Sequence, residues 1–270
     1  FRRVLFRSHR DYFNAGAQIL LTNTFGANRI RLAHFDLETK VTAINNTGVR
    51  IAREVARDKA FVAGCIGPTG VRLAPLGSLT EEEAVHVFYQ QAATLTGVDL
   101  YVLETFQDVA ELRAAVKGVR EAAGNDVVVI AHLSVEEDGR LADGTGPERY
   151  GPALNALAVD AIGLNCGSGP HALFRALARL RAVTTKPLSA VPSCNGSPEY
   201  FAGCFENSGA WIAGGCCGTT PDHIRALARV TIAEPSAARS AKGSGATKPM
   251  VPVAFAKRSD LAAKIGRAHV

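Results

Sequence analysis

The sequence predicts a parallel α/β fold, and within that class a (β/α)8 TIM barrel that lacks its first strand. Short apolar runs rich in β-branched residues alternate along the chain with longer amphipathic stretches, which is the order of repeated βα units. The apolar runs are hydrophobic almost without interruption, as expected for parallel strands covered on both faces. We expect seven such strands, at Ile19–Asn23, Phe61–Gly67, Leu100–Thr105, Val127–Leu133, Ala161–Asn165, Leu188–Val191 and Trp211–Gly215.

The residues at the strand ends distinguish two architectures, an open doubly wound sheet and a closed barrel. A barrel gathers the carboxyl ends of all its strands around one mouth, whereas an open sheet uses chiefly the point where its strand order reverses. Here six of the seven predicted strands end in polar, small or reactive residues, which favours the barrel. These ends are Asn23-Thr24, Gly67-Pro68-Thr69-Gly70, Glu104-Thr105, His132, Asn165-Cys166 and Gly215-Cys216-Cys217.

The segments between the strands have the length and the start signals of helices. In the segment Leu79–Gly97, Thr80 and Glu83 have the spacing of a capping box, in which each side chain bonds to the other residue's backbone N–H. Asp108–Ala122 has an apolar stripe at helical spacing. We therefore expect helices over both segments.

The two ends of the chain differ from the predicted barrel. Helix-forming residues Asp11–Ala15 lead directly into the first predicted strand, so we expect the missing barrel strand before residue 1. Residues 1–8 are rich in arginine and, like the last six residues, resemble translated sequencing-adapter DNA, so we expect a non-native leader there. The barrel would then occupy residues 9–232. Residues 233–270 have linker composition, and we expect them to lead into a truncated second domain.

Composition and charge exclude several classes of protein. A chain of 270 residues with 47% hydrophobic and 20% charged residues is neither disordered nor collagen-like. The net charge of +5 lies at the ends, since residues 11–231 hold 19 basic and 23 acidic residues, so we expect no nucleic-acid partner. No apolar run approaches the roughly 20 residues that span a bilayer, and no signal peptide is recognisable, so we expect a cytoplasmic protein without a membrane partner.

The cysteines carry the strongest chemical signal. Cys216 and Cys217 are adjacent, follow a strand and are flanked by glycines, and Cys166 lies at the end of another strand. Alternate barrel strands contribute to the same interior layer, so Cys166 is expected to approach the pair. Three thiolates suit Zn²⁺, and a site with three protein ligands keeps its fourth position for a substrate. Among the remaining cysteines, expected to be buried packing residues, Cys194 is the main rival ligand.

Several segments together resemble one known family. They are Ala15-Gly16-Ala17-Gln18-Ile19, Thr22-Asn23-Thr24-Phe25-Gly26-Ala27-Asn28, Gly64-Cys65-Ile66-Gly67-Pro68-Thr69-Gly70, Leu103-Glu104-Thr105-Phe106, Gly163-Leu164-Asn165-Cys166 and Gly215-Cys216-Cys217-Gly218-Thr219-Thr220-Pro221. In order and spacing, they resemble the homocysteine S-methyltransferase family. That family includes the homocysteine-binding domain of cobalamin-dependent methionine synthase and betaine–homocysteine methyltransferase.

The resemblance implies a zinc-dependent methyltransferase that converts homocysteine to methionine. It assigns Cys166, Cys216 and Cys217 as the zinc ligands and catalytic residues, with the substrate thiol at the open position. The methyl donor stays open among methylcorrinoid or methyltetrahydrofolate, S-methylmethionine, S-adenosylmethionine and betaine. For the amino-acid end of homocysteine, the expected substrate-binding residues are Glu104 for the ammonium group, Asn23 and Asn165 as positioners, and the backbone N–H groups near Thr24 and Phe25 for the carboxylate.

Some features depart from the family pattern and leave several hypotheses open. The segment of the first barrel strand that helps to form the substrate pocket in relatives is absent, so the chain could be an inactive fragment of an active enzyme. The tail after residue 233 resembles the junction to a methylenetetrahydrofolate reductase domain in bifunctional relatives, although a methionine synthase parent also fits. The cysteines would also suit a zinc-thiolate domain that binds thiols or senses redox state, or a barrel enzyme with a cysteine redox pair. We expect His132 to line the pocket and Gly67–Gly70 to shape the mouth.

Overall fold

The computed structural model describes residues 2–232, and the predicted linker and tail at 233–270 lie outside the described residues. All seven strands are parallel and follow the order β1-β2-β3-β4-β5-β6-β7, each paired with the next in sequence. Their bounds are β1 Ile19–Leu21, β2 Phe61–Ile66, β3 Leu100–Phe106, β4 Val128–Leu133, β5 Ala161–Cys166, β6 Leu188–Pro192 and β7 Ile212–Ala213.

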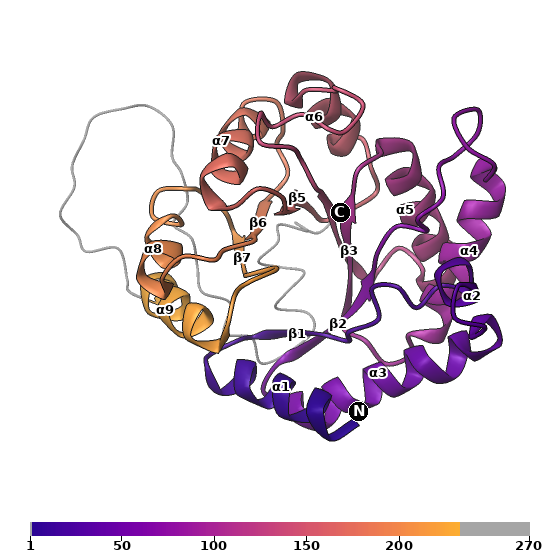
Figure 1. Cartoon of the computed structure of the whole chain (residues 1–270), viewed down its shortest axis with the longest axis horizontal. Coiled ribbons are helices and arrows are strands. Elements are labelled where there is room, and N and C mark those ends of the chain that lie inside the picture. Colours follow the sequence, from indigo (N-terminus) through magenta and orange to yellow (C-terminus); the bar gives the residue numbers. More distant parts are fainter. Residues whose placement is uncertain (1, 233–270) are drawn as a thin grey trace.

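The sheet curls into a barrel with the helices around its outer side (Figure 1). Within residues 2–232, β1 and β7 do not pair with one another, so the curled sheet has seven strands rather than eight. The predicted barrel class and its shortage of one strand are thereby confirmed. The helices are α1 Arg2–Asn14, α2 Arg29–Ala33, the 3₁₀ helix η1 Glu38–Lys40, α3 Val41–Ala56, α4 Glu81–Thr94, α5 Val109–Ala123, α6 Pro147–Asn155, α7 Pro170–Arg181, α8 Pro198–Gly203 and α9 Pro221–Ile232.

The strands are apolar on both faces because each face packs against a different partner. Every residue of β2 and of β4 is buried. Successive side chains of a strand point to opposite sides, so one set lies under the helices and the second set fills the barrel interior. The interior set includes Phe61, Ala63, Leu100, Val102, Val128, Ile130 and Ala161.

Two helices begin where the sequence predicts them. Thr80 caps α4, and the reciprocal bonds between Thr80 and Glu83 form the predicted capping box. Asp108 caps α5 by accepting a hydrogen bond from the N–H of Ala110 at 2.7 Å. A Cβ at Gly118 would lie 2.6 Å from the carbonyl oxygen of Val85, so glycine permits the close packing of α5 on α4.

The first helix is longer than the sequence predicts. Helix α1 begins at Arg2 rather than at Asp11, because Phe6 packs against the core and Arg2 forms an ion pair with Glu54 of α3. Tyr12 donates a hydrogen bond at 2.8 Å to the carbonyl oxygen of Thr219, which joins α1 to the segment after β7. The expectation that residues 1–8 are a non-native leader concerns their origin and stays a prediction.

Some strand ends also differ from the predicted bounds. Strand β1 ends at Leu21 because Asn23 has a φ of +56°, which breaks the extended ladder. Strand β5 continues to Cys166, which pairs in register with Pro192 of β6.

No helix among residues 2–232 is long and apolar enough to cross a membrane.

Candidate metal and substrate site

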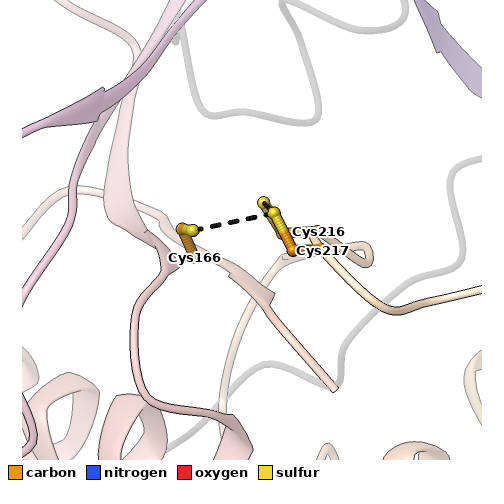
Figure 2. A group of neighbouring side chains, drawn as sticks. All are labelled: Cys166, Cys216 and Cys217. Carbon is orange, nitrogen blue, oxygen red and sulfur yellow. Dashed lines mark hydrogen bonds between the residues drawn. The ribbon is translucent and has the colours of Figure 1, made fainter. Parts of the chain in front are cut away.

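Three cysteines come together at the carboxyl ends of β5 and β7. The Sγ atoms of Cys166 and Cys217 lie 4.0 Å apart, and those of Cys216 and Cys217 lie 3.9 Å apart (Figure 2). Their ligand atoms all lie within 4.8 Å of one another, and all three thiols are free. In the part of the chain that the structure describes, no other three His, Cys, Asp or Glu residues are grouped in this way.

The sulfur spacing fits a tetrahedral metal ion. Zinc–sulfur bonds of about 2.3 Å at tetrahedral angles place two sulfur ligands about 3.8 Å apart. The two observed separations of 3.9 and 4.0 Å differ from this value by only a few tenths of an ångström. A disulfide, in contrast, needs a sulfur–sulfur distance of about 2.05 Å. The three residues therefore present a set of soft donors with room for an ion between them.

Backbone conformation turns Cys166 toward the Cys216-Cys217 pair. Alternation along β5 would place the side chains of Asn165 and Cys166 on opposite faces of the sheet. Cys166 instead has a φ of +63°, in the left-handed region that non-glycine residues seldom adopt. This turn at the strand end lets two consecutive residues face the barrel mouth. Such backbone outliers concentrate at functional sites.

Main-chain hydrogen bonds hold the Cys216-Cys217 segment. The N–H of Cys216 donates to the carbonyl oxygen of Pro192 at 3.0 Å, and the N–H of Cys194 donates to that of Cys217 at 2.9 Å. The hydroxyl of Thr219 donates to the carbonyl oxygen of Cys216 at 2.7 Å. The backbone is thus fixed by neighbouring loops, and the thiols remain free to bind an ion.

Electrostatics disfavour three thiolates at this place without a cation. Burial raises the pKa of the Cys216 thiol to about 12, and the charge of a Cys166 thiolate adds to the rise. A divalent cation among the sulfur atoms would reverse this preference, because metal coordination deprotonates a thiol. The chemistry of the donor set therefore fits a thiophilic metal ion.

Cys194, the rival ligand, lies outside the group. Its thiol is buried and accepts a hydrogen bond from the N–H of Gly196 at 3.3 Å. Its own N–H donates to the carbonyl oxygen of Cys217, so the residue supports the Cys216-Cys217 segment through its backbone. The expectation that Cys194 is chiefly a packing residue agrees with this placement.

Glu104 lies on an irregular part of β3 near the cysteines. The pairing of β3 with β4 shifts register between Leu103 and Phe106, and Thr105 there has a φ of +63°. A bulge of this kind redirects side chains at a strand end. The Glu104 carboxylate accepts a hydrogen bond from the Cys65 thiol at 2.8 Å. Burial raises the pKa of Glu104, and the bond from Cys65 opposes that rise.

Asn165 is engaged with β3. Its side-chain oxygen accepts a hydrogen bond from the N–H of Thr105 at 2.7 Å, and its amide nitrogen donates to the Thr105 hydroxyl at 2.8 Å. The same nitrogen lies 4.0 Å from the sulfur of Cys216. Asn165 therefore stabilises the left-handed Thr105 and connects the strand of Glu104 to the cysteine group. A contact between Asn165 and the substrate remains a prediction.

The segment after β1 supplies backbone donors. Asn23 is exposed, whereas Thr24 is buried and donates from its hydroxyl to the carbonyl oxygen of Cys65 at 2.8 Å. The N–H groups of Thr24 and Phe25 donate to no acceptor within residues 2–232. Two adjacent free N–H groups are suited to a carboxylate, as the sequence predicts. Glycine at position 67 makes room for the Phe25 ring, since a Cβ there would meet it.

Two buried polar residues near the strand ends, Glu111 and His132, differ in whether they have hydrogen-bond partners. Glu111 on α5 accepts hydrogen bonds from the N–H and the hydroxyl of Thr69, at 2.7 and 2.6 Å, which fixes the predicted mouth-shaping turn. His132 on β4 is only 2% exposed, and neither of its ring nitrogens has a hydrogen-bond partner in residues 2–232. Burial lowers the pKa of His132 to about 4. The side chain of His132 is thus buried, and the expectation that it lines the substrate pocket remains a prediction.

The sequence predicts that Cys65 is a packing residue. In the structure its thiol instead donates a hydrogen bond to Glu104, a contact that the sequence does not predict. Cys65 and Glu104 lie on neighbouring strands, and only the register of β2 against β3 brings them together. The sequence carries one relevant signal, because Cys65 is two residues from Gly67 and close to the predicted mouth.

Comparison with known proteins identifies the family. The sequence profile described as "Homocysteine S-methyltransferase" matches residues 3–231, which is most of the chain. The chain belongs to the homocysteine S-methyltransferase family. Within that family, it is 37% identical over 254 residues to methionine synthase from Mycobacterium leprae and, over the same length, to methionine synthase from Mycobacterium tuberculosis. Each alignment covers 83% of this chain and 21% of the relative, so the chain spans about a fifth of those proteins.

Solved structures of homocysteine methyltransferases share the fold. The homocysteine methyltransferase MmuM from Escherichia coli in its metallated form superposes with a TM-score of 0.72, at 26% identity and 83% coverage of both chains. The oxidised form of the same protein gives a TM-score of 0.71, with 25% identity and 84% coverage of both chains. These matches agree with the predicted family and with the barrel class.

Proposed function

We propose that this protein transfers a methyl group to the thiol of homocysteine and forms methionine, with Zn²⁺ held by Cys166, Cys216 and Cys217. The observation that carries the proposal is the convergence of these three thiols within 4.8 Å of one another, in a member of the homocysteine S-methyltransferase family. Zinc bound there would act as a Lewis acid that lowers the pKa of the substrate thiol and leaves its sulfur nucleophilic at neutral pH.

The chain's own residues would bind and orient the amino-acid end of the substrate. The Glu104 carboxylate suits the ammonium group, because it is half-buried at the strand end and its Oε2 atom accepts no hydrogen bond from residues 2–232. The free N–H groups of Thr24 and Phe25 suit the carboxylate. With both ends held, the substrate sulfur would be directed toward the cysteines, and orientation of this kind lowers the barrier to reaction.

The methyl transfer itself is a substitution at carbon. A bond forms between the homocysteine sulfur and the methyl carbon, the bond from that carbon to the donor breaks, and the thiol proton has already left to solvent. The donor would be an electrophilic methyl compound, such as a methylcorrinoid supplied by methyltetrahydrofolate, S-methylmethionine, S-adenosylmethionine or betaine. We also propose that the protein acts in the cytoplasm, where its free cysteines would stay reduced.

Metal content and product formation test the proposal. We expect one zinc ion per chain, its loss in Cys216→Ala, proton release on addition of homocysteine, and methionine with one member of the donor panel. The variant Cys204→Ala is a matched control that removes a thiol outside the metal group.

Three results would contradict the proposal in different ways. A wild-type chain without zinc would refute the ligand assignment. Homocysteine binding without methionine from any donor would favour a domain that binds thiols without methyl transfer. Methionine formation that survives complete removal of zinc by a chelator would refute the proposed role of the metal.

A further inference from the structure

The thiol of Cys65 occupies a position that the proposed reaction does not use. It is 2% exposed, lies on β2, and donates to Oε1 of Glu104 at 2.8 Å. Cys65 is therefore inaccessible as a nucleophile, and it is not among the three cysteines grouped for a metal. A buried thiol that serves only packing would need no polar partner, so the contact with a carboxylate requires an explanation.

The backbone of Cys65 is held on both sides. Its N–H donates to the hydroxyl of Thr22 at 3.1 Å, and its carbonyl oxygen accepts from the hydroxyl of Thr24 at 2.8 Å. The two threonine hydroxyls lie 2.6 Å apart and bond to each other. The Cys65 thiol therefore extends from a fixed backbone, and one of these threonines, Thr24, carries one of the two free N–H groups.

Glu104, in contrast, lies on an irregular strand end. The register shift of β3 falls at this residue, and the following residue, Thr105, has a left-handed backbone. Within residues 2–232, the Cys65 thiol is the hydrogen-bond donor that holds the Glu104 side chain. Since a carboxylate with one oxygen anchored has fewer rotamers to lose on binding, this bond would preorganise Oε2 for a cationic group.

We propose that Cys65 is a positioning residue that fixes Glu104 for the α-ammonium group of an amino-acid thiol substrate. This inference rests on the proposed function and adds a specificity device to it: the pair distinguishes thiols that carry an ammonium group from thiols that do not. Serine can replace the donor, because its hydroxyl also donates to a carboxylate, whereas alanine cannot.

Calorimetric binding of two thiols to the zinc-loaded protein tests the inference. Homocysteine carries the ammonium group, and 4-mercaptobutanoate has the same chain without it. We expect Cys65→Ala to weaken homocysteine binding about fivefold to tenfold and to leave the binding of 4-mercaptobutanoate unchanged. Cys65→Ser should stay within about twofold of the wild type for both thiols. Cys204→Ala, the same change outside the metal group, should alter neither affinity.

The outcomes separate this inference from the function on which it rests. Equal homocysteine affinity in Cys65→Ala and the wild type would overturn the positioning role. Equal weakening of both thiols would also overturn it, since it would indicate a structural role alone. Failure of the zinc-loaded wild type to bind homocysteine would overturn the proposed function, and the inference with it.

Discussion

The two sides of the barrel mouth are built in different ways. The metal side, defined by Cys166, Cys216 and Cys217, lies at the ends of β5 and β7 and is partly exposed. The amino-acid side, defined by Thr24, Cys65 and Glu104, lies at the ends of β1, β2 and β3 and is bound together by side-chain hydrogen bonds. On the metal side the backbone is held by neighbouring loops and the thiols are left without strong partners.

This difference agrees with what each side is proposed to bind. A metal ion must displace protons from its ligands, so the thiols gain nothing from strong hydrogen bonds before it arrives. A substrate's ammonium and carboxylate groups are recognised by preformed acceptors and donors, so holding those groups in place favours binding. Asn165 joins the sides through its two bonds to Thr105. If the two sides act independently, a substitution on the amino-acid side should leave zinc binding unchanged, and a substitution on the metal side should leave the amino-acid side intact.

The largest expected effect concerns His132, on the strand between the two sides. The pKa of His132 is about 4 in the folded protein, against 6.5 in the unfolded chain. As the pH falls, the imidazole of the unfolded chain therefore binds a proton before that of the folded protein does. Stability is therefore unaffected above pH 6.5 and is lost between about pH 6.5 and 4, by up to about 3 kcal/mol. Urea unfolding at pH 7 and pH 4.5 should show this loss in the wild type and a smaller one in His132→Leu.

The exposed His34 provides the matched control for that measurement. His34→Leu should keep the pH dependence of the wild type, because the side chain of His34 is exposed and is not part of the buried strand. Identical pH dependence in His132→Leu and the wild type would show that His132 finds a buried partner when folded.

The next effect separates the two sides directly. In Glu104→Gln we expect zinc content equal to that of the wild type and a homocysteine Kd raised about 30-fold, since the charged partner of the ammonium group is lost. The Kd of 4-mercaptobutanoate should not change. Zinc analysis and calorimetry measure the two properties, and loss of zinc in this variant would contradict the independence of the sides.

The smallest effect concerns the connection between the sides. Asn165→Ala removes both bonds to Thr105 and leaves a backbone N–H without its acceptor, so we expect the free energy of unfolding to fall by about 1 to 2 kcal/mol. Urea unfolding of the metal-free protein measures the fall. Adding Thr105→Gly should restore part of it, because glycine adopts a positive φ without strain. An unchanged stability in Asn165→Ala would show that the connection does not hold the bulge.

Local sequence signals predict those parts of the molecule that depend on neighbouring residues. The capping box of Thr80 and Glu83 forms because both partners lie within one helical turn. The predicted strands are found because parallel strands buried on both faces must be apolar throughout. The start of α1 is missed because its first turns depend on Phe6 packing against the core and on the ion pair between Arg2 and Glu54.

At the site, the sequence by itself determined which thiols could bind a metal and that they would meet. Strand ends of a parallel barrel share one mouth, so the position of each cysteine after its strand was sufficient. Only the tertiary structure decided that Cys166 turns inward through a positive φ, that Cys194 faces Gly196, and that Cys65 bonds to Glu104. The physical reason is that backbone angles and strand register are set by the packing of distant segments, which a local pattern does not encode.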